Sequence, residues 1–299
     1  MVRRGTYSIV ARDPETGELG AAVQSHWFSV GSIVTWAQPG IGAVATQSIA
    51  EPAYGPRLLD ALAGGEAPTD ALARLLADDG AARYRQVAVI APGGPPATHT
   101  GEGCIAFAGH VTAEDFSVQA NMMASDAVWP AMADAYAAAT GPLSRRMLAA
   151  LRAAEGAGGD VRGKQSAAMV VVGPSGEPWR RAVDLRVEDH PEPLDELERL
   201  LGLRDAYDLA TRGDDLTGEG RHAEAGECYR QAAALAPDNH ELLFWAGVAE
   251  FAHGDRDAGL AQVRRAIALQ PGWRDLIARV GADIAPDAPA LRAALAEEG

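Results

Sequence analysis

The stretch that decides the fold is Gly5-Thr6-Tyr7-Ser8-Ile9-Val10-Ala11, close to the start of the sequence. A short run of apolar and small residues after a glycine predicts a first β-strand with Thr6 at its head. A cut between Gly5 and Thr6 would leave a threonine whose free amine lies beside its own hydroxyl. That pair is sufficient for nucleophilic attack on a carbonyl. The alternative is purely structural, because β-propensity alone favours threonine in strands.

The segments that follow predict two hairpins and then helices. Residues 13–18 carry an early proline and a late glycine, which is typical of a turn between strands. Further strand-like runs cover 19–24, 33–37 and 41–47, and helical patterns cover 54–63 and 68–77. Strands first and helices afterwards, without strict alternation, predict an α+β fold in which helices cover an antiparallel sheet.

Several segments carry a resemblance to a known family. They are Thr6–Gly20, Val23–Gly31, Gly42–Ser48, Gly101–Cys104, Val118–Asn121, Gly163–Ala168 and Val183–Pro191. Together they resemble a bacterial family of unknown function assigned to the N-terminal-nucleophile (Ntn) hydrolase superfamily. The resemblance spans roughly residues 6–200 and implies a four-layer αββα sandwich with a nucleophile heading the first strand. It implies no substrate. Many members begin Met-Thr, whereas residues 2–5 intervene here, so a cut after Gly5 would be needed.

Charge and composition limit the classes of partner. The 299 residues include 41 acidic and 26 basic side chains, for a formal net charge of −15. An acidic excess of this size argues against a nucleic-acid partner, which usually requires several Lys or Arg contacts with phosphates. The length is comfortable for two domains. We therefore expect a protein of two domains that does not bind nucleic acid.

Cysteine usage and hydropathy favour a cytoplasmic protein. Cys104 and Cys228 lie far apart in the sequence, so we expect no disulfide, which fits a reducing compartment. Arg3 and Arg4 are not followed by an apolar run of signal-peptide type. No segment has the roughly 18 consecutive apolar residues of a membrane span. We expect a cytoplasmic location and no membrane partner.

The last third of the sequence contains a repeat. Gly213, Gly247 and Gly281 are 34 residues apart, as are Pro237 and Pro271. Small residues where helices cross and a proline after the second helix resemble tetratricopeptide repeats. The alternative is an irregular bundle of helical hairpins. A lead-in helix is expected over 194–203, a third first helix over 273–282, and a capping helix over 288–297.

The repeat predicts a domain boundary and an interaction surface. We divide the chain into an Ntn-hydrolase-like domain over 1–200 and an all-α tetratricopeptide-like repeat domain over 201–299. About three repeats are usually needed for stability, so two and a half copies suggest packing on another surface. Phe244, Trp245 and Trp273 would need cover. We therefore expect a homo-oligomer, and possible binding of a protein partner through the helical repeats.

The candidate site residues gather at strand ends and in one polar loop. Thr6 is the expected nucleophile, and Asn121 and the Gln165 loop are candidate donors to an oxyanion. The structural alternatives are turn chemistry for Asn121, a half-buried histidine satisfied by backbone for His26, and a solvated loop for residues 160–166. The expected substrate-binding residues are Ser25, His26, Gln47, Asp160, Arg162, Lys164 and Ser166.

The hypothesis that these patterns favour is an Ntn hydrolase cleaving an amide-type C–N bond in a small molecule, an amide or a ureide. Thr6 would act after removal of residues 1–5. The sequence contains no Walker loop, Rossmann fingerprint or cluster at metal-ligand spacing, so we expect no cofactor and no metal. The rival hypothesis is a non-catalytic Ntn-like scaffold whose helical repeats bind a protein partner.

Overall fold

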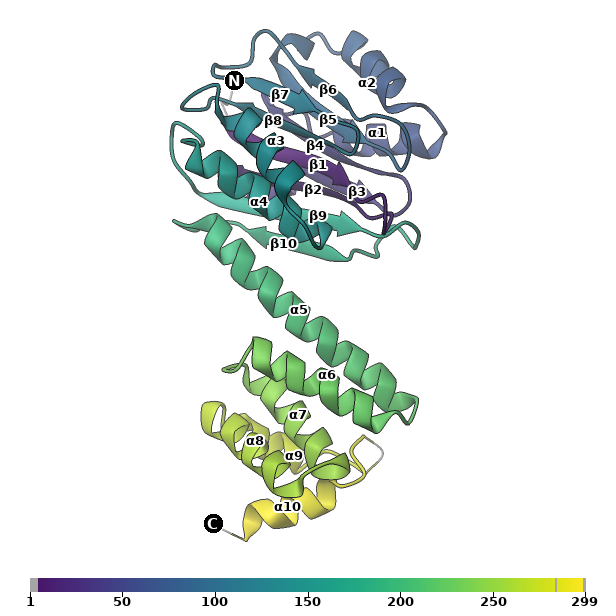
Figure 1. Cartoon of the computed structure of the whole chain (residues 1–299), viewed down its shortest axis with the longest axis vertical. Helices are drawn as coiled ribbons and strands as arrows, with labels where there is room; N and C mark the ends of the chain where they lie inside the picture. The colour runs from purple at the N-terminus through teal and green to yellow at the C-terminus, as the bar shows by residue number, and fades with distance from the viewer. Residues whose placement is uncertain (1–4, 283, 298–299) are drawn as a thin grey trace. The chain divides into compact units, whose positions relative to one another are not determined.

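The computed structural model describes residues 5–282 and 284–297, and the chain divides into two compact units, Met1–Glu198 and Arg199–Gly299. The first unit is a mixed α+β fold, as predicted, with two antiparallel sheets (Figure 1). Its strands are β1 Thr6–Arg12, β2 Leu19–Ser25, β3 Thr35–Gln38, β4 Gly42–Ser48, β5 Arg85–Ile90, β6 Ala97–Thr100, β7 Gly109–Thr112, β8 Phe116–Asn121, β9 Ser166–Val172 and β10 Val183–Val187. Its helices are α1 Tyr54–Ala63, α2 Pro68–Ala77, α3 Val128–Ala138 and α4 Leu143–Gly156.

Both predicted hairpins are confirmed. β1 pairs with β2, and β3 pairs with β4, each in antiparallel register. The hairpins end up in different sheets, however. The larger sheet has the order β10-β9-β2-β1-β8-β7, and the smaller has the order β3-β4-β5-β6. β1 is therefore an interior strand, with β2 on one side and β8 on the other, and its backbone is held on both edges.

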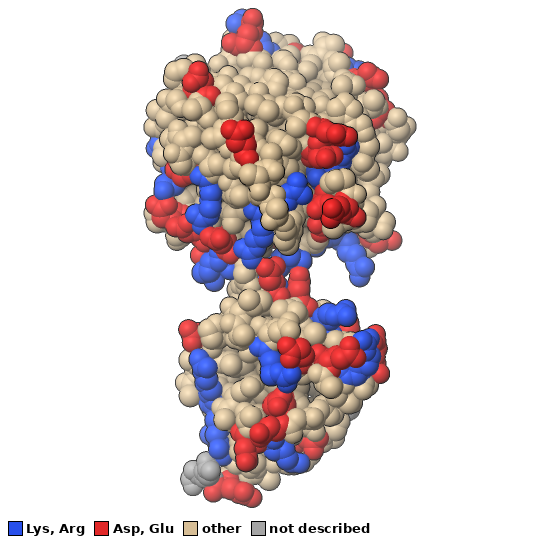
Figure 2. All heavy atoms as spheres, in the orientation of Figure 1, with Lys and Arg blue, Asp and Glu red and all other residues tan. Residues whose placement is uncertain are grey.

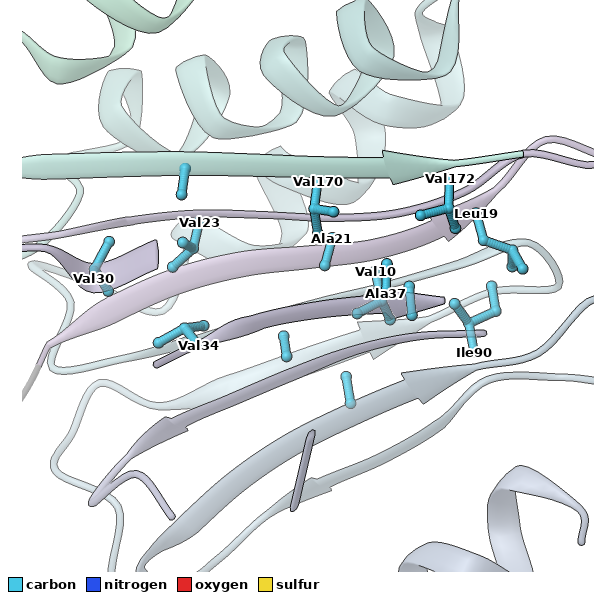
Figure 3. Packing of buried hydrophobic residues seen from close by; sticks show 14 residues of the cluster. Val10, Leu19, Ala21, Val23, Val30, Val34, Ala37, Ile90, Val170 and Val172 are labelled. Carbon is cyan, nitrogen blue, oxygen red and sulfur yellow. The ribbon is translucent and has the colours of Figure 1, made fainter. Parts of the chain in front are cut away.

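The two sheets face each other across an apolar core of small side chains. Because side chains alternate along a strand, every second residue of β1 and β2 points to this core. The buried cluster consists of Val10, Leu19, Ala21, Val23, Val30, Val34, Ala37, Ala43, Ala45, Ala88, Ile90, Ala168, Val170 and Val172 (Figure 3). Alanine and valine predominate, so little bulk separates the sheets. Helices α3 and α4 pack on the larger sheet, and α1 and α2 pack on the smaller one.

The second unit consists of helices. They are α5 Pro193–Gly218, α6 His222–Leu235, α7 His240–His253, α8 Arg256–Leu269, α9 Gly272–Ile277 and α10 Ala288–Ala296. Two of these helices begin with a side-chain cap, as Asn239 accepts from the backbone N–H groups of Glu241 and Leu242, and Asp255 does the same for α8. The predicted prolines follow the ends of α6 and α8.

Three details differ from the sequence prediction. The expected lead-in helix over 194–203 is only the start of α5, which continues through Gly202 and Gly213 to Gly218 with no proline after Pro193 to end it. The expected helix over 273–282 ends at Ile277. Phe244 needs no external cover, because it is fully buried and its ring stacks on Trp273 with centroids 4.4 Å apart.

Two of the three phased glycines, Gly213 and Gly247, lie where helices approach closely. A Cβ atom on Gly213 would lie 2.6 Å from the Tyr229 ring, and one on Gly247 would lie 2.8 Å from Val263. Gly259 is tighter still, since its Cβ would lie 2.3 Å from the backbone nitrogen of Phe251. Backbone cannot move aside as the end of a side chain can, so α7 and α8 require glycine at this crossing.

We predict that Gly259→Ala lowers the free energy of unfolding of the helical unit by about 1–3 kcal/mol, because the added methyl overpacks the α7–α8 crossing. Gly226→Ala is the matched control. Its Cβ would meet only the Arg230 side chain at 3.6 Å, and alanine is the better helix former by up to about 1 kcal/mol. Urea unfolding followed by helical circular dichroism measures both; equal midpoints would contradict the packing argument.

Candidate functional site

A row of polar side chains crosses one end of the larger sheet. Thr6 is paired with Ser25 on β2 and with Asn121 on β8, and Ser25 is paired with Ser166 on β9. Residues directly opposite each other on neighbouring strands point to the same side of a sheet. The antiparallel register therefore aligns the backbones of four predicted site residues from strands that lie up to 160 residues apart in sequence, and all four are buried.

The hydroxyl of Thr6 belongs to a short chain of hydrogen bonds that ends at the preceding carbonyl. Its Oγ1 donates to Oγ of Ser25 at 3.1 Å, and Oγ of Ser25 donates to the carbonyl oxygen of Gly5. The guanidinium of Arg162 donates to the same oxygen at 2.9 Å. The carbonyl oxygen of the Gly5–Thr6 peptide bond thus accepts hydrogen bonds from two donors, one of which is charged. The Thr6 hydroxyl belongs to the residue that directly follows this carbonyl.

Asp160 holds the guanidinium of Arg162 in place. Its carboxylate is fully buried and accepts from the Arg162 side chain through Nε at 3.1 Å and Nη2 at 2.8 Å. It also accepts from the backbone N–H groups of Arg162 at 2.9 Å and of His26 at 3.2 Å. A buried charge is stable only when it is paired and hydrogen-bonded, and both conditions are met here. The pair therefore has one defined geometry.

Three buried amides form a cluster at the backbone of Thr6, with Gln47 and Gln86 on the smaller sheet and Asn121 on β8 of the larger one. Nε2 of Gln47 and Nδ2 of Asn121 both donate to Oε1 of Gln86, at 2.8 and 3.0 Å. The same two nitrogens lie 3.3 and 3.4 Å from the carbonyl oxygen of Thr6. Gln86 also donates to the carbonyl of Ala120 at 2.9 Å. Gln86 was not predicted from the sequence, because it follows Arg85 at the polar start of β5, just before the apolar residues 87–90.

The remaining predicted residues are placed away from the Thr6 hydroxyl. Oγ of Ser166 donates to the carbonyl of Trp27 and accepts from Val30, which fixes the loop after β2. Nε2 of Gln165 donates to Asp189 at 3.1 Å. Nζ of Lys164 pairs with Glu192 at 2.5 Å. The side chains of Lys164, Gln165 and Ser166 therefore make their contacts elsewhere. The predicted residues that the structure brings together are Thr6, Ser25, Gln47, Asn121, Asp160 and Arg162.

His26 contacts both Asp160 and the backbone of Lys164. Its backbone N–H supports Asp160, as described, and its ring Nδ1 lies 3.2 Å from the carbonyl oxygen of Lys164. The ring is thus satisfied by backbone, which was one of the two readings of this residue from the sequence. Its contribution to the site is to fix the loop that carries Arg162.

Tyr7 lies on the opposite face of β1 from Thr6. Burial raises the pKa of its phenol well above the ordinary value, and the neighbouring Glu155 carboxylate raises it further. The phenol therefore stays protonated and donates to Oε2 of Glu155 at 2.5 Å. This bond ties the head of β1 to α4, so the strand that carries Thr6 is fixed from its outer face as well.

Thr6 is closed off from solvent while Gly5 is in place, since only 1% of its surface is exposed. The described residues contain no group of three or more His, Cys, Asp or Glu that could hold a metal ion. Among the same residues no helix is long and apolar enough to cross a membrane. The groups gathered around Thr6 are its hydroxyl, the Gly5 carbonyl and the Asp160–Arg162 ion pair.

We predict that Gln86→Leu lowers the free energy of unfolding by about 1–3 kcal/mol, because the buried amides of Gln47 and Asn121 would lose their shared acceptor. Gln165→Leu is the control, since its single bond to Asp189 lies at the surface, and the expected change is within about 0.5 kcal/mol. Chemical denaturation of the full chain gives both values. Similar values for the two variants would show that the amide cluster adds nothing to stability.

Comparison with known proteins places this architecture in one family. The description "Family of unknown function (DUF1028)" belongs to the family that matches residues 6–197. A crystal structure of a DUF1028 protein from Silicibacter pomeroyi is 36% identical and superposes with a TM-score of 0.60, covering 66% of this chain and 88% of that one. No curated protein matches the chain. Because the family match covers well over half of the sequence, the chain belongs to the DUF1028 family.

Proposed function

We propose that the first unit is an N-terminal-nucleophile hydrolase that cleaves an amide-type C–N bond in a small molecule, with Thr6 as the nucleophile after removal of residues 1–5. The observation that carries the proposal is the geometry at Gly5. The carbonyl next to the Thr6 hydroxyl accepts hydrogen bonds from Arg162 and Ser25. Donors converging on one carbonyl oxygen are the arrangement that stabilises a developing oxyanion.

The arrangement of layers supports the same proposal. Helices α3 and α4 pack on the larger sheet, the two sheets share a core, and α1 and α2 pack on the smaller sheet. The resemblance to Ntn hydrolases implies such an αββα sandwich, with the nucleophile at the head of the first strand. β1 begins at Thr6.

The first reaction of the site would be the cut that frees Thr6. Oγ of Thr6 attacks the carbonyl carbon of Gly5, and its proton passes through Ser25 toward the carbonyl oxygen. The C–N bond then breaks, the nitrogen of Thr6 takes the proton, and residues 1–5 remain attached as an ester on Oγ. Water hydrolyses that ester, which leaves a carboxylate on Gly5 and a free amine on Thr6.

In the mature protein the free amine of Thr6 would accept the proton from Oγ as it attacks a substrate carbonyl. Arg162 and Ser25 would hold the oxyanion in the position that the Gly5 carbonyl now occupies. We assign that role to them because Asn121 donates to Gln86 and to the backbone of Thr6, while Gln165 donates to Asp189. Asn121 and Gln47 position the nucleophile.

The proposed substrate is a small amide or ureide, and the proposed chemistry uses no cofactor. On the face drawn in Figure 2, many Lys and Arg side chains lie beside Asp or Glu. With a net charge of −15, this favours a small-molecule substrate over nucleic acid.

One observation favours the second candidate, a scaffold whose helices bind a protein partner. The helical unit contains a hollow of about 480 Å³ lined in part by Tyr207, Asp214, Glu241 and Trp245. Tyr207 donates to Glu241 at 2.8 Å, and Tyr229 donates to Asp214 at 2.7 Å. Two carboxylates beside an aromatic wall suit a partner segment, or a second copy of the chain, that presents a cationic side chain.

We predict that Thr6→Ala abolishes the cut after Gly5 and any amide hydrolysis, a loss of about 10³-fold or more, because no nucleophilic oxygen remains. Stability should change by only about 1 kcal/mol, the worth of one hydroxyl hydrogen bond. Thr6→Ser is the control that keeps the oxygen and retains the cut. Intact mass and a screen of amides and cyclic ureides measure both. Wild-type turnover by the alanine variant would rule the mechanism out.

A further inference from the structure

We propose that Asp160 restricts the acyl side of the substrate to an α-carbon that carries no side chain, so that the enzyme acts on amides of glycine and similar acids. This inference rests on the proposed function, in which a substrate carbonyl takes the place of the Gly5 carbonyl. With the oxygen held by Arg162 and Ser25, and the carbon held next to Oγ of Thr6, the group on the acyl side has to follow the path that Gly5 takes.

The space beside the α-carbon of Gly5 is filled by the Asp160 carboxylate. A Cβ atom placed on Gly5 would lie 2.7 Å from Oδ2, 2.8 Å from Cγ and 2.8 Å from Oδ1. Real Cβ atoms essentially never approach other heavy atoms this closely. The three heavy atoms nearest to that Cβ all belong to the Asp160 side chain, so the crowding at Gly5 comes from this carboxylate.

The carboxylate has no free direction in which to move. Its two oxygens accept four hydrogen bonds, from Nε and Nη2 of Arg162 and from the backbone N–H groups of Arg162 and His26. Its side chain is fully buried, and the backbone of Asp160 forms an antiparallel bridge with Met123. Displacing it would leave a buried charge with fewer partners, which is costly.

The same ion pair also links substrate size to catalysis. Arg162 touches both the Asp160 carboxylate and the carbonyl oxygen of Gly5. A methyl group on the α-carbon would either push Asp160 and its bound Arg162, or shift the carbonyl away from Arg162 and Ser25. In both cases the reacting carbonyl leaves its donors, and a misplacement near 1 Å costs about 10²-fold in rate. Asp160 is thus a specificity-determining residue.

The first test compares the cut in the purified full-length wild-type chain and in its Gly5→Ala variant. We expect the wild-type chain to lose residues 1–5, and Gly5→Ala to be cut about 10²-fold more slowly, as followed by intact mass. Thr6→Ala gives the background from other proteases. Equal rates for the two chains, where the wild-type chain is cut, would refute the inference and leave the proposed function standing. A wild-type chain that is not cut, and that has no amidase activity once Thr6 is exposed, would refute both.

The second test asks whether Asp160 causes the discrimination. The quantity measured is a ratio, the rate of the cut with Gly5 intact divided by the rate with Gly5→Ala. It is measured in an Asp160→Asn background, which keeps the size of the side chain. It is then measured in an Asp160→Ala background, which removes the carboxylate. Because each ratio is taken within one background, a general loss of activity cancels. We expect Asp160→Asn to keep a large ratio and Asp160→Ala to bring it near 1. An unchanged ratio with Asp160→Ala would overturn the assignment to Asp160.

A third measurement needs no substitution in the site. Protein prepared with Thr6 as its first residue is assayed with N-acetylglycine 4-nitroanilide and N-acetyl-L-alanine 4-nitroanilide. We expect kcat/KM to favour the glycine compound by about 10²-fold. Equal values would contradict the inference even if every Asp160 variant failed to fold.

Discussion

The ion pair between Asp160 and Arg162 is the interaction on which the candidate site depends. It places a guanidinium on the carbonyl of Gly5, a carboxylate against the α-carbon of the same residue, and the backbone of His26 alongside. A pair with a fully buried carboxylate contributes little net stability, because desolvating the charge offsets much of the attraction. It does impose a single geometry, and a site that must hold a carbonyl within a fraction of an ångström needs that geometry.

The architecture around the pair is built to keep β1 still. The strand lies inside the larger sheet, with a neighbour on each edge, the Tyr7–Glu155 bond on its outer face and the amides of Gln47 and Asn121 on its inner face. Small side chains in the core let the second sheet come close enough for the Gln47 amide to reach the backbone of Thr6, while Asn121 reaches it from the neighbouring strand β8. The apolar core and the polar site are therefore parts of one packing arrangement.

Sequence reasoning succeeded where a local pattern carries the information. The strand after Gly5, the two hairpins and the prolines after α6 and α8 all follow from turn chemistry and periodicity. Thr6, Ser25 and Asn121 could be named as candidates from their chemistry and their places at strand ends, but their pairing depends on register between distant strands, which no local pattern encodes. Gln86 escaped notice because a glutamine at the polar start of a strand resembles a surface position. Gln165 and Lys164 were selected with their loop, but in that loop it is Asp160 and Arg162 that turn inward.

The distance along the chain between Thr6 and Arg162 has a consequence for when the protein becomes active. The nucleophile leaves the ribosome first, and the guanidinium that polarises its carbonyl follows more than 150 residues later. A nascent chain that ends before Arg162 contains the nucleophile but not the guanidinium. Under the proposed mechanism, the free amine of Thr6 would thus form only after β1, the loop after α4 and the sheet between them have assembled. Activation would follow the assembly of this part of the first unit, happen once per molecule, and require no external signal.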